Sequence, residues 1–213
     1  SIEGACSVLQ QGQQPKTFDF HSPILELPRL LKTKLDTIPT LGKPSLNLDH
    51  VAKWRDRLSI YNGLRVGLVW AGRPEHVNDK NRSIDPELMK PLLRENGVKF
   101  FSLQVDHDGD AINVLGPDVI DLAPDLTSFS ETAAAMENLD LIVSIDSSPA
   151  HLAGALGRPI WTLLPFLPDW RWMLDRNDTP WYPTMRLFRQ KKRGDWSKVV
   201  VDVAQELKKI IRV

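Results

Sequence analysis

From residue 65 onward, the hydrophobic and polar positions alternate between two patterns. Short apolar runs rich in β-branched and aromatic residues are typical of strands buried on both faces of a parallel sheet. Between them, apolar residues recur at helical spacing. The alternation predicts an α/β fold with a doubly wound, mainly parallel sheet and right-handed crossovers. The predicted strands are Val66 to Trp70, Lys99 to Leu103, Val119 to Leu122, Leu141 to Ile145, Ile160 to Leu164 and Met185 to Phe188.

Helical spacing is found beside most of these runs. It predicts helices over residues 85–95 and 130–139, and an amphipathic helix over 196–213. A further short helix is predicted over residues 50–58, before the first strand. A doubly wound sheet binds its ligands beyond the carboxyl ends of its strands, where the strand order reverses. The loops that follow the strands are therefore where we expect function.

The segment from Leu141 to Pro165 predicts a strand, a polar turn, a helix and a second strand. The first strand stops at Asp146, and Ser147 or Ser148 can cap the helix that follows. The amino end of such a helix offers free backbone N–H groups and the positive end of a dipole. This turn is therefore predicted to bind a phosphate.

Residues 1–62 differ in character from the rest of the chain. A glutamine-rich stretch is loop-like, and prolines interrupt short apolar pieces. We therefore expect residues 1–62 to be the tail of a preceding N-terminal domain plus a linker. Residues 63–213 are expected to form one domain. Because the sequence opens at Ser1 without a methionine, we expect it to be an excised or processed piece.

Composition argues against several classes of function. Lys plus Arg and Asp plus Glu both number 27, so no general attraction to nucleic acid or anionic membrane is expected. No apolar run approaches the roughly 20 residues that a membrane span needs. Cys6 is the only cysteine, which suits a reducing compartment and argues against a zinc–thiolate site. We expect a cytoplasmic protein without a cofactor.

The loop after the first strand, Ala71 to Ser83, is long and basic. It carries Arg73, His76, Lys80 and Arg82. Such a loop can close over a diphosphate, because charge-assisted hydrogen bonds from Lys and Arg are about twice as strong as neutral ones. The alternative is a solvated surface loop. A position opposite the phosphate-binding turn would favour function.

The turn after the fourth strand carries the strongest candidates. Asp146 can hold sugar hydroxyls or fix the turn, while Ser147 and Ser148 can cradle phosphate. His151 falls in the first helical turn, so it can face the same anion. The alternative for the serines and the aspartate is plain helix capping. For His151 the alternative is a structural histidine.

The loop after the fifth strand is rich in tryptophan. Trp170, Trp172 and Trp181 can form an aromatic wall for a sugar or base. Alternatively, they simply cover the sheet edge, which is the interpretation favoured for at least two of them. Arg171 is the better candidate for a phosphate contact.

Two further groups of polar residues are weaker candidates. Thr127 and Glu131 follow the third strand. An acidic cluster surrounds a glycine, which is the usual composition of an exposed loop, so no metal is assigned to it. This cluster contains Asp106, His107, Asp108 and Asp110.

Several motifs together resemble a known family. The run Asp146-Ser-Ser-Pro-Ala-His-Leu-Ala-Gly-Ala-Leu-Gly-Arg-Pro is similar to the Asp-Ser/Thr-Gly-x-x-His-Leu-Ala-Ala-Ala-Leu-Gly-x-Pro signature of glycosyltransferase family 9, the ADP-heptose transferases. Val69-Trp-Ala-Gly, Asp125-Leu-Thr-Ser-Phe-Ser-Glu-Thr-Ala-Ala, Asp169-Trp-Arg-Trp and a Pro-Trp-Tyr-Pro motif resemble bacterial tetratricopeptide-repeat proteins with an O-GlcNAc-transferase-like region. The resemblance covers roughly residues 18–210.

The resemblance implies the C-terminal, donor-binding half of a GT-B fold, with a Rossmann-like sheet. It implies that Asp146, Ser147, Ser148 and His151 hold the donor diphosphate and sugar. Lys80, helped by Arg82, would neutralise phosphate charge as the nucleoside diphosphate departs. Lys80 and His151 are thus the predicted catalytic residues. Heptosyltransferases usually have a glycine at the position of Ser148. The serine side chain narrows the turn.

The function expected is therefore the donor-binding half of a metal-independent glycosyltransferase that uses a nucleotide-sugar. In this family the acceptor site and the catalytic base usually lie on the N-terminal half, so this chain alone is expected to be inactive. The acceptor, whether protein, peptide or lipid-linked sugar, is left open. Two alternatives are a non-catalytic nucleotide-sugar-binding module and a nucleotide-sugar epimerase, which needs paired acid and base residues across a cleft.

Overall fold

A six-stranded sheet forms the centre of the computed structural model, which describes all residues except 1–6, 8, 40–41, 106–108 and 212–213. Every neighbouring pair of strands is parallel. The predicted α/β class and doubly wound sheet are confirmed, and each predicted strand is present. The strands are β1 (Leu64–Val69), β2 (Val98–Ser102), β3 (Val119–Asp121), β4 (Leu141–Ile145), β5 (Ile160–Leu164) and β6 (Met185–Arg189).

The strand order β3-β2-β1-β4-β5-β6 makes β1 and β4 neighbours. The chain winds outward from β1 in one direction through β2 and β3, and from β4 in the other through β5 and β6. The order therefore reverses between β1 and β4, which is where ligands of such sheets bind. The loops that follow these two strands, 70–85 and 146–147, meet at this point.

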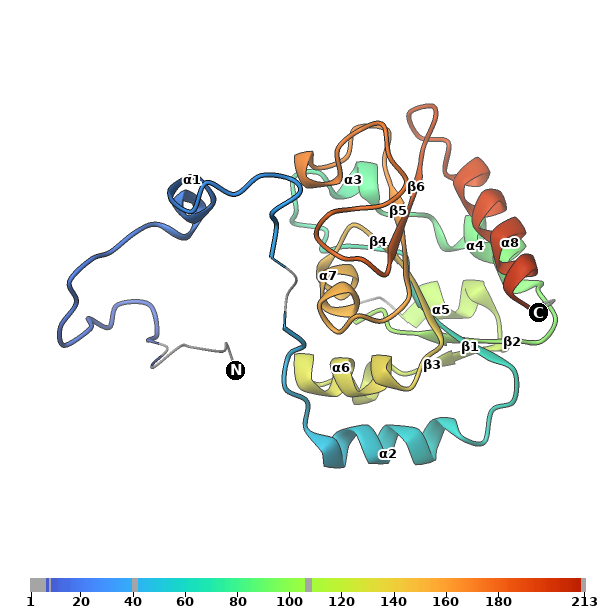
Figure 1. Cartoon of the computed structure of the whole chain (residues 1–213). Helices are drawn as coiled ribbons and strands as arrows, with labels where there is room; N and C mark the ends of the chain where they lie inside the picture. The colour runs from blue at the N-terminus through green and yellow to red at the C-terminus, as the bar shows by residue number, and fades with distance from the viewer. Residues whose placement is uncertain (1–6, 8, 40–41, 106–108, 212–213) are drawn as a thin grey trace.

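Helices cover both faces of the sheet (Figure 1). One face packs against α2 (Leu48–Leu58), α6 (Phe129–Glu137) and α7 (Ser148–Ala155). The other packs against α4 (Pro86–Leu93), α5 (Gly109–Leu115) and α8 (Trp196–Ile211). Burial on both faces explains why the central strands are almost wholly apolar. Along β4, Ile142 joins the first core, while Val143 and Ile145 join the second.

Helix α2 is part of the α/β core although it precedes β1. It begins at Leu48 because the side chain of Asn47 accepts hydrogen bonds from the N–H groups of Asp49 and His50. The predicted helix is thus confirmed, with a start two residues earlier. Trp54 and Leu58 are fully buried against α6 and its neighbours. The domain boundary at residue 62 stays a prediction.

The described residues up to about 35 lie away from the sheet, whereas Leu46, just before α2, packs against the core. The described part of the segment before α2 contains a 3₁₀ turn, Ile24–Glu26, followed by the short α1 (Leu27–Leu30). Figure 1 shows it as a long arm beside the α/β core. Several large apolar side chains of this arm are exposed, namely Phe18, Phe20, Ile24, Leu25, Leu30, Leu31 and Leu35.

Three helices differ from the prediction. Helix α6 begins one residue earlier than predicted, because the hydroxyl of Ser128 accepts from the N–H of Glu131. Helix α5 was not predicted, and its first two residues belong to the acidic cluster that was expected to be an exposed loop. A single turn, α3 (Asp79–Arg82), lies inside the predicted basic loop.

Two more 3₁₀ turns, Ala123–Asp125 and Trp170–Trp172, follow β3 and β5. Across the residues that the structure describes, no helix combines the length and the apolar character needed to cross a membrane.

Candidate functional site

Arg82 joins the loop after β1 to the turn after β4. Its guanidinium donates to the backbone carbonyl of Asp146 over 2.9 Å and pairs with Asp79 at 3.3 Å. The two side chains of this pair are only 14% and 15% exposed. Gly72 makes room for them, since a Cβ at this position would lie 2.4 Å from atoms of both. The predicted encounter of the basic loop with the turn thus occurs through Arg82.

Ser147 occupies the N-cap position of α7 without capping it. Its hydroxyl lies 3.4 Å from the carbonyl oxygen of Ile145, to which it donates, and 3.3 Å from the hydroxyl of Ser144. Ser148 is the first residue of the helix and is exposed. The capping alternative therefore does not describe Ser147, and no side-chain cap covers the amino end of the helix.

His151 projects from the first turn of α7 into a polar and aromatic environment. Its Nδ1 lies 3.0 Å from the hydroxyl of Tyr182, and its Nε2 lies 3.8 Å from a carboxylate oxygen of Asp146. The imidazole stacks on the indole of Trp172, with centroids 5.3 Å apart and planes inclined by 20°. One third of the His151 side chain stays exposed, so a ligand can reach it.

The surroundings of His151 lower its pKa. Burial is the main cause, because it disfavours the charged ring, and Arg171 acts in the same direction. The carboxylates of Asp146 and Asp169 oppose this effect without cancelling it. The neutral form of the imidazole therefore predominates at pH 7, since even its ordinary pKa lies below that value and the surroundings lower it further.

Arg171 and the tryptophans form the wall beyond His151. The guanidinium of Arg171 pairs with Asp169 at 3.2 Å and lies 5.6 Å from the centre of the Trp170 ring. Trp181 donates its indole N–H to the carbonyl of Arg171, and Trp172 is completely buried. Of these tryptophans, only Trp170 is largely exposed, at 72%. The interpretation that a tryptophan simply covers the sheet edge therefore holds for Trp172.

Lys80 lies on α3 beside Arg82 but borders a different space. It lines a cavity of about 350 Å³ together with residues that follow β5 and β6, among them Phe166, Gln190 and Arg193. The lining of this cavity does not include Asp146 or His151. The structure thus brings Arg82, and not Lys80, into contact with the turn.

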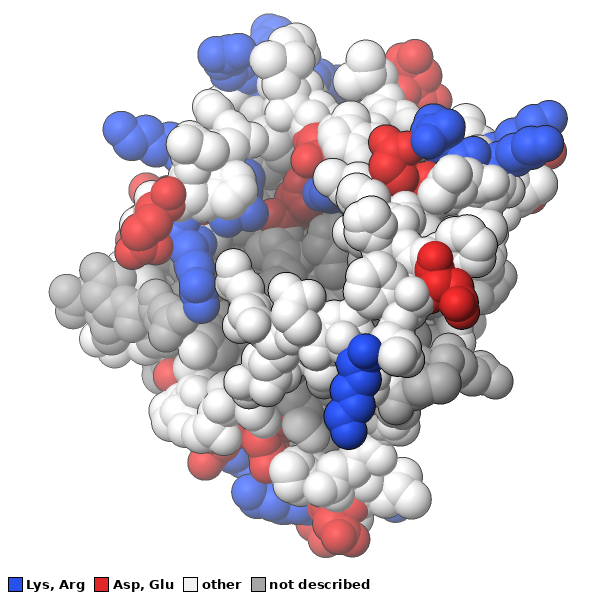
Figure 2. All heavy atoms as spheres, turned by 90° about the vertical axis from the view of Figure 1, so that its left-hand side faces the viewer, with Lys and Arg blue, Asp and Glu red and all other residues white. Residues whose placement is uncertain are grey.

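The remaining basic-loop candidates lie on the surface. Arg73 and His76 are exposed, and Nδ1 of His76 accepts from the N–H of Asn78 at 3.2 Å. Acidic and basic side chains are interspersed over the face shown in Figure 2, which is hollowed near its centre. A ligand-binding role for these two residues stays a prediction.

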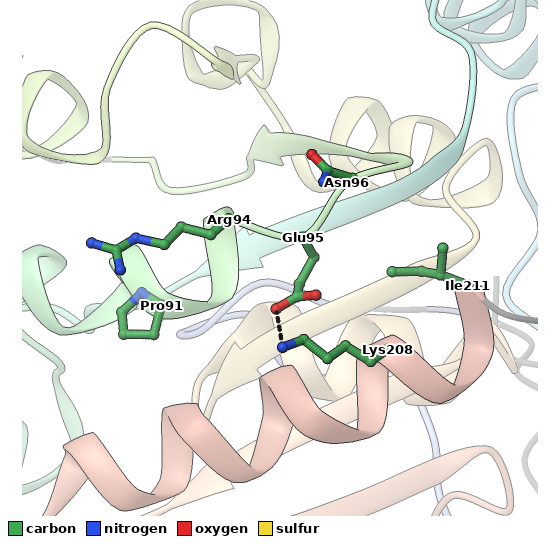
Figure 3. A pocket seen from close by; sticks show the side chains of 6 residues that line it. All are labelled: Pro91, Arg94, Glu95, Asn96, Lys208 and Ile211. Carbon is green, nitrogen blue, oxygen red and sulfur yellow. Dashed lines mark ion pairs between the residues drawn. The ribbon is translucent and has the colours of Figure 1, made fainter.

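A second cavity, of about 560 Å³, lies between α4 and α8, away from the turn (Figure 3). Lys208 reaches across it to pair with Glu95 at 3.3 Å. Its lining residues are Pro91, Arg94, Glu95, Asn96, Lys208 and Ile211. No residue of the predicted site is among them.

Of the two weaker candidates, Thr127 is exposed and Glu131 has structural partners. Glu131 accepts from the indole N–H of Trp54 at 2.7 Å and lies 3.2 Å from Nδ1 of His50, which ties α6 to α2. Within the described ranges, no three His, Cys, Asp or Glu side chains are placed to hold a metal ion. Residues 106–108 of the acidic cluster lie outside the described residues.

Sequence reasoning missed two polar residues of the site. Asp79 was not proposed, although its spacing of three residues from Arg82 on a helical turn is typical of an ion pair. Tyr182 was noticed only as part of a motif, and its hydroxyl contacts His151 across 31 residues of sequence. No local pattern reveals that second contact, because it depends on how the loop after β5 folds back.

Gly154 allows Tyr182 to approach α7, so Gly154→Ala should destabilise the protein. A Cβ at this position would lie 2.5 Å from the Tyr182 ring, and overpacking of this kind typically costs about 1–3 kcal/mol. The higher helix propensity of alanine offsets about 1 kcal/mol of this cost, so we expect a net loss of about 0–2 kcal/mol in urea unfolding. Gly42→Ala, where a Cβ meets nothing within 4 Å, is the control. A stabilised Gly154→Ala variant would contradict this packing argument.

One part of the site, the turn at Asp146 with His151, lies within the stretch of the chain that matches a family model, whereas Arg82 and Tyr182 lie outside it. Residues 86–165 match glycosyltransferase family 9 (heptosyltransferase). This range runs from the start of α4 to the residue after β5 and contains the turn at Asp146. The resemblance to glycosyltransferase family 9 is confirmed.

Solved structures of family 9 proteins share the fold. ADP-heptose LPS heptosyltransferase II of E. coli aligns with a TM-score of 0.58 at 17% identity, over 83% of this chain and 56% of that chain. The family 9 glycosyl transferase of Veillonella parvula aligns with a TM-score of 0.57 at 14% identity, over 82% and 53%. These likenesses confirm the Rossmann-like fold. The chain spans little more than half of either structure.

A relative of known sequence is considerably longer than this chain. Protein FlbA of Caulobacter vibrioides is 30% identical over 169 residues, which cover 74% of this chain and 27% of FlbA. The chain thus spans about a quarter of that relative. The predicted tetratricopeptide-repeat and O-GlcNAc-transferase-like context stays a prediction.

Proposed function

We propose that this chain binds the donor of a glycosyltransferase that takes its sugar from a nucleotide-sugar. The observation that carries the proposal is the meeting of Arg82, the turn at Asp146 and the uncapped amino end of α7 between β1 and β4. This is the place where doubly wound sheets bind nucleotides. The family 9 match and the ADP-heptose enzyme among the solved structures support a nucleotide-sugar as the ligand class.

The diphosphate of the donor would lie at the amino end of α7. The backbone N–H groups at Ser147 and Ser148 and the helix dipole favour an anion there. Arg82 and Arg171 would supply positive charge from either side, and His151 a further polar contact. Lys80 and Arg73, on the loop that carries Arg82, would reach the outer phosphate. Asp146 would hold sugar hydroxyls.

Sugar transfer would be promoted by stabilising the departing nucleoside diphosphate. As the bond from the sugar to the phosphate breaks, negative charge grows on the diphosphate, and fixed cations and N–H groups lower the free energy of that state. Because the protein supplies these charges, we propose that the reaction needs no metal ion. We further propose that residues 63–213 form the nucleotide-sugar-binding domain, that the acceptor binds elsewhere in a longer cytoplasmic protein, and that the chain alone is inactive.

Calorimetry with nucleoside diphosphates tests the proposal. At least one of ADP, UDP, GDP and CDP should bind. Lys80→Ala and His151→Ala should each weaken that binding by about 3- to 30-fold, the effect of losing one or two polar contacts. Lys53→Ala, an exposed lysine on α2, is the matched control and should leave affinity unchanged.

Two results would decide against parts of the proposal. If no nucleoside diphosphate binds the chain, and the two substitutions leave binding to the longer protein unchanged, the donor site is not here. If binding is retained but the longer protein transfers no sugar to protein, peptide or lipid-linked acceptors, the non-catalytic binding module becomes the better interpretation.

A further inference from the structure

The contact between Tyr182 and His151 links helix α7, inside the range that matches family 9, to the loop before β6, outside that range. The Tyr182 hydroxyl lies 3.0 Å from Nδ1 of His151, and their rings meet edge to face, with centroids 5.7 Å apart. The Tyr182 ring lies directly against Gly154 of α7, where a Cβ would clash with it. Trp172 packs flat on a face of the imidazole. The ring of His151 is therefore held by neighbours from two directions.

The charged groups around the ring determine where its proton lies. In a neutral imidazole one nitrogen carries the proton and the other is an acceptor. Nε2 faces the carboxylate of Asp146 at 3.8 Å. A proton on Nε2 is attracted by this carboxylate, whereas a lone pair there would be repelled. The proton therefore belongs on Nε2, and Nδ1 must accept.

Tyr182 supplies the matching donor for Nδ1. Burial raises the pKa of the Tyr182 phenol, so its hydroxyl keeps its proton at neutral pH. Arg171 counteracts this shift in pKa without cancelling it. The O–H of Tyr182 can thus donate to Nδ1 while the Nε2–H of His151 faces Asp146.

We infer that Tyr182 is a positioning residue that holds His151 as the Nε2–H tautomer, so that the neutral ring offers a hydrogen-bond donor at Nε2. The phosphate part of this inference rests on the proposed function: the donor would point to the diphosphate bound at the amino end of α7. Because the Nδ1 lone pair of His151 accepts the hydrogen bond from Tyr182, His151 does not take a proton from the acceptor substrate of the sugar transfer. Instead, its Nε2–H stabilises the departing diphosphate by donating a hydrogen bond.

Nuclear magnetic resonance of the chain with ¹⁵N-labelled histidine tests the tautomer without any ligand. In the unmodified chain at neutral pH, we expect His151 to carry its proton on Nε2, with a hydrogen-bonded lone pair on Nδ1. In Tyr182→Phe the aromatic ring at position 182 stays in place, but Nδ1 of His151 loses its hydrogen-bond donor. The ¹⁵N resonance of Nδ1 should therefore move to the position typical of a nitrogen whose lone pair accepts no hydrogen bond. His151→Gln assigns the signals. Tyr61→Phe, at the only other tyrosine, is the matched control.

The outcomes separate this inference from the proposed function. A proton on Nδ1 in the unmodified chain, or an Nδ1 resonance unchanged by Tyr182→Phe, overturns the positioning role. If the resonances behave as expected, calorimetry with the nucleoside diphosphate that binds best should show a loss of about fivefold for Tyr182→Phe, the effect of one neutral hydrogen bond. Expected resonances with no nucleotide binding support the tautomer and refute the donor site.

Discussion

Replacing Trp54 with alanine should lower the free energy of unfolding by about 3–5 kcal/mol, the usual effect of removing a buried tryptophan side chain. Trp54 is 1% exposed and packs into the core formed by α2, α6 and α7. The substitution also removes the indole N–H that donates to Glu131, whose side chain is only 12% exposed. Urea unfolding followed by circular dichroism measures the loss.

The matched control is Trp170→Ala, which removes a tryptophan that is 72% exposed. The Trp170 ring contacts the Arg171 guanidinium and the edge of Trp181. An exposed cation–π contact contributes about 0.5–1 kcal/mol, so this variant should lose much less stability than Trp54→Ala. A chain starting at residue 63 should lose at least as much stability as Trp54→Ala, whereas one starting at residue 44 should not. A loss below about 1 kcal/mol for Trp54→Ala would show that α2 is dispensable to the core.

The strands were predictable because their signal is local and strong. Leu141 to Ile145 and Ile160 to Leu164 were predicted with the bounds that the structure has. Helix ends were less predictable, because they depend on which polar side chain turns back to cap. Asn47 and Ser128 do so, while Ser147 stands at the N-cap position and bonds elsewhere. Helix α5 lacked a local signal and packs against α4, which the sequence does not reveal.

The site was predictable at the level of loops and not of individual contacts. Strand ends and the rule for doubly wound sheets identify the loops after β1 and β4, but the adjacency of those strands appears only in the fold. Lys80 and Arg82 are two positions apart on one helical turn, so they face different neighbours. The contact of Arg82 with Asp146 spans 64 residues and depends on that geometry.

The same geometry predicts that Arg82→Gln will have the largest effect on ligand binding. Under the proposed function, this substitution removes a cation beside the diphosphate and leaves the carboxylate of Asp79 unpaired near an anion. Hydrogen bonds to charged groups contribute about 1.5–3 kcal/mol, so affinity for the best nucleoside diphosphate should fall by about 10- to 150-fold in calorimetry. Arg82→Lys should recover only part of this loss, because a lysine cannot span Asp79 and the Asp146 carbonyl together.

Two comparisons separate a direct contact from a general effect of charge. Arg94→Gln removes the same charge beside the cavity of Figure 3, so it should leave affinity unchanged. In Arg82→Gln/Asp79→Asn the unpaired carboxylate is also neutralised, and part of the affinity should return, because the repulsion of the diphosphate has been removed. If Arg82→Gln binds as tightly as the parent chain, Arg82 only braces the turn at Asp146, and the diphosphate depends on other groups.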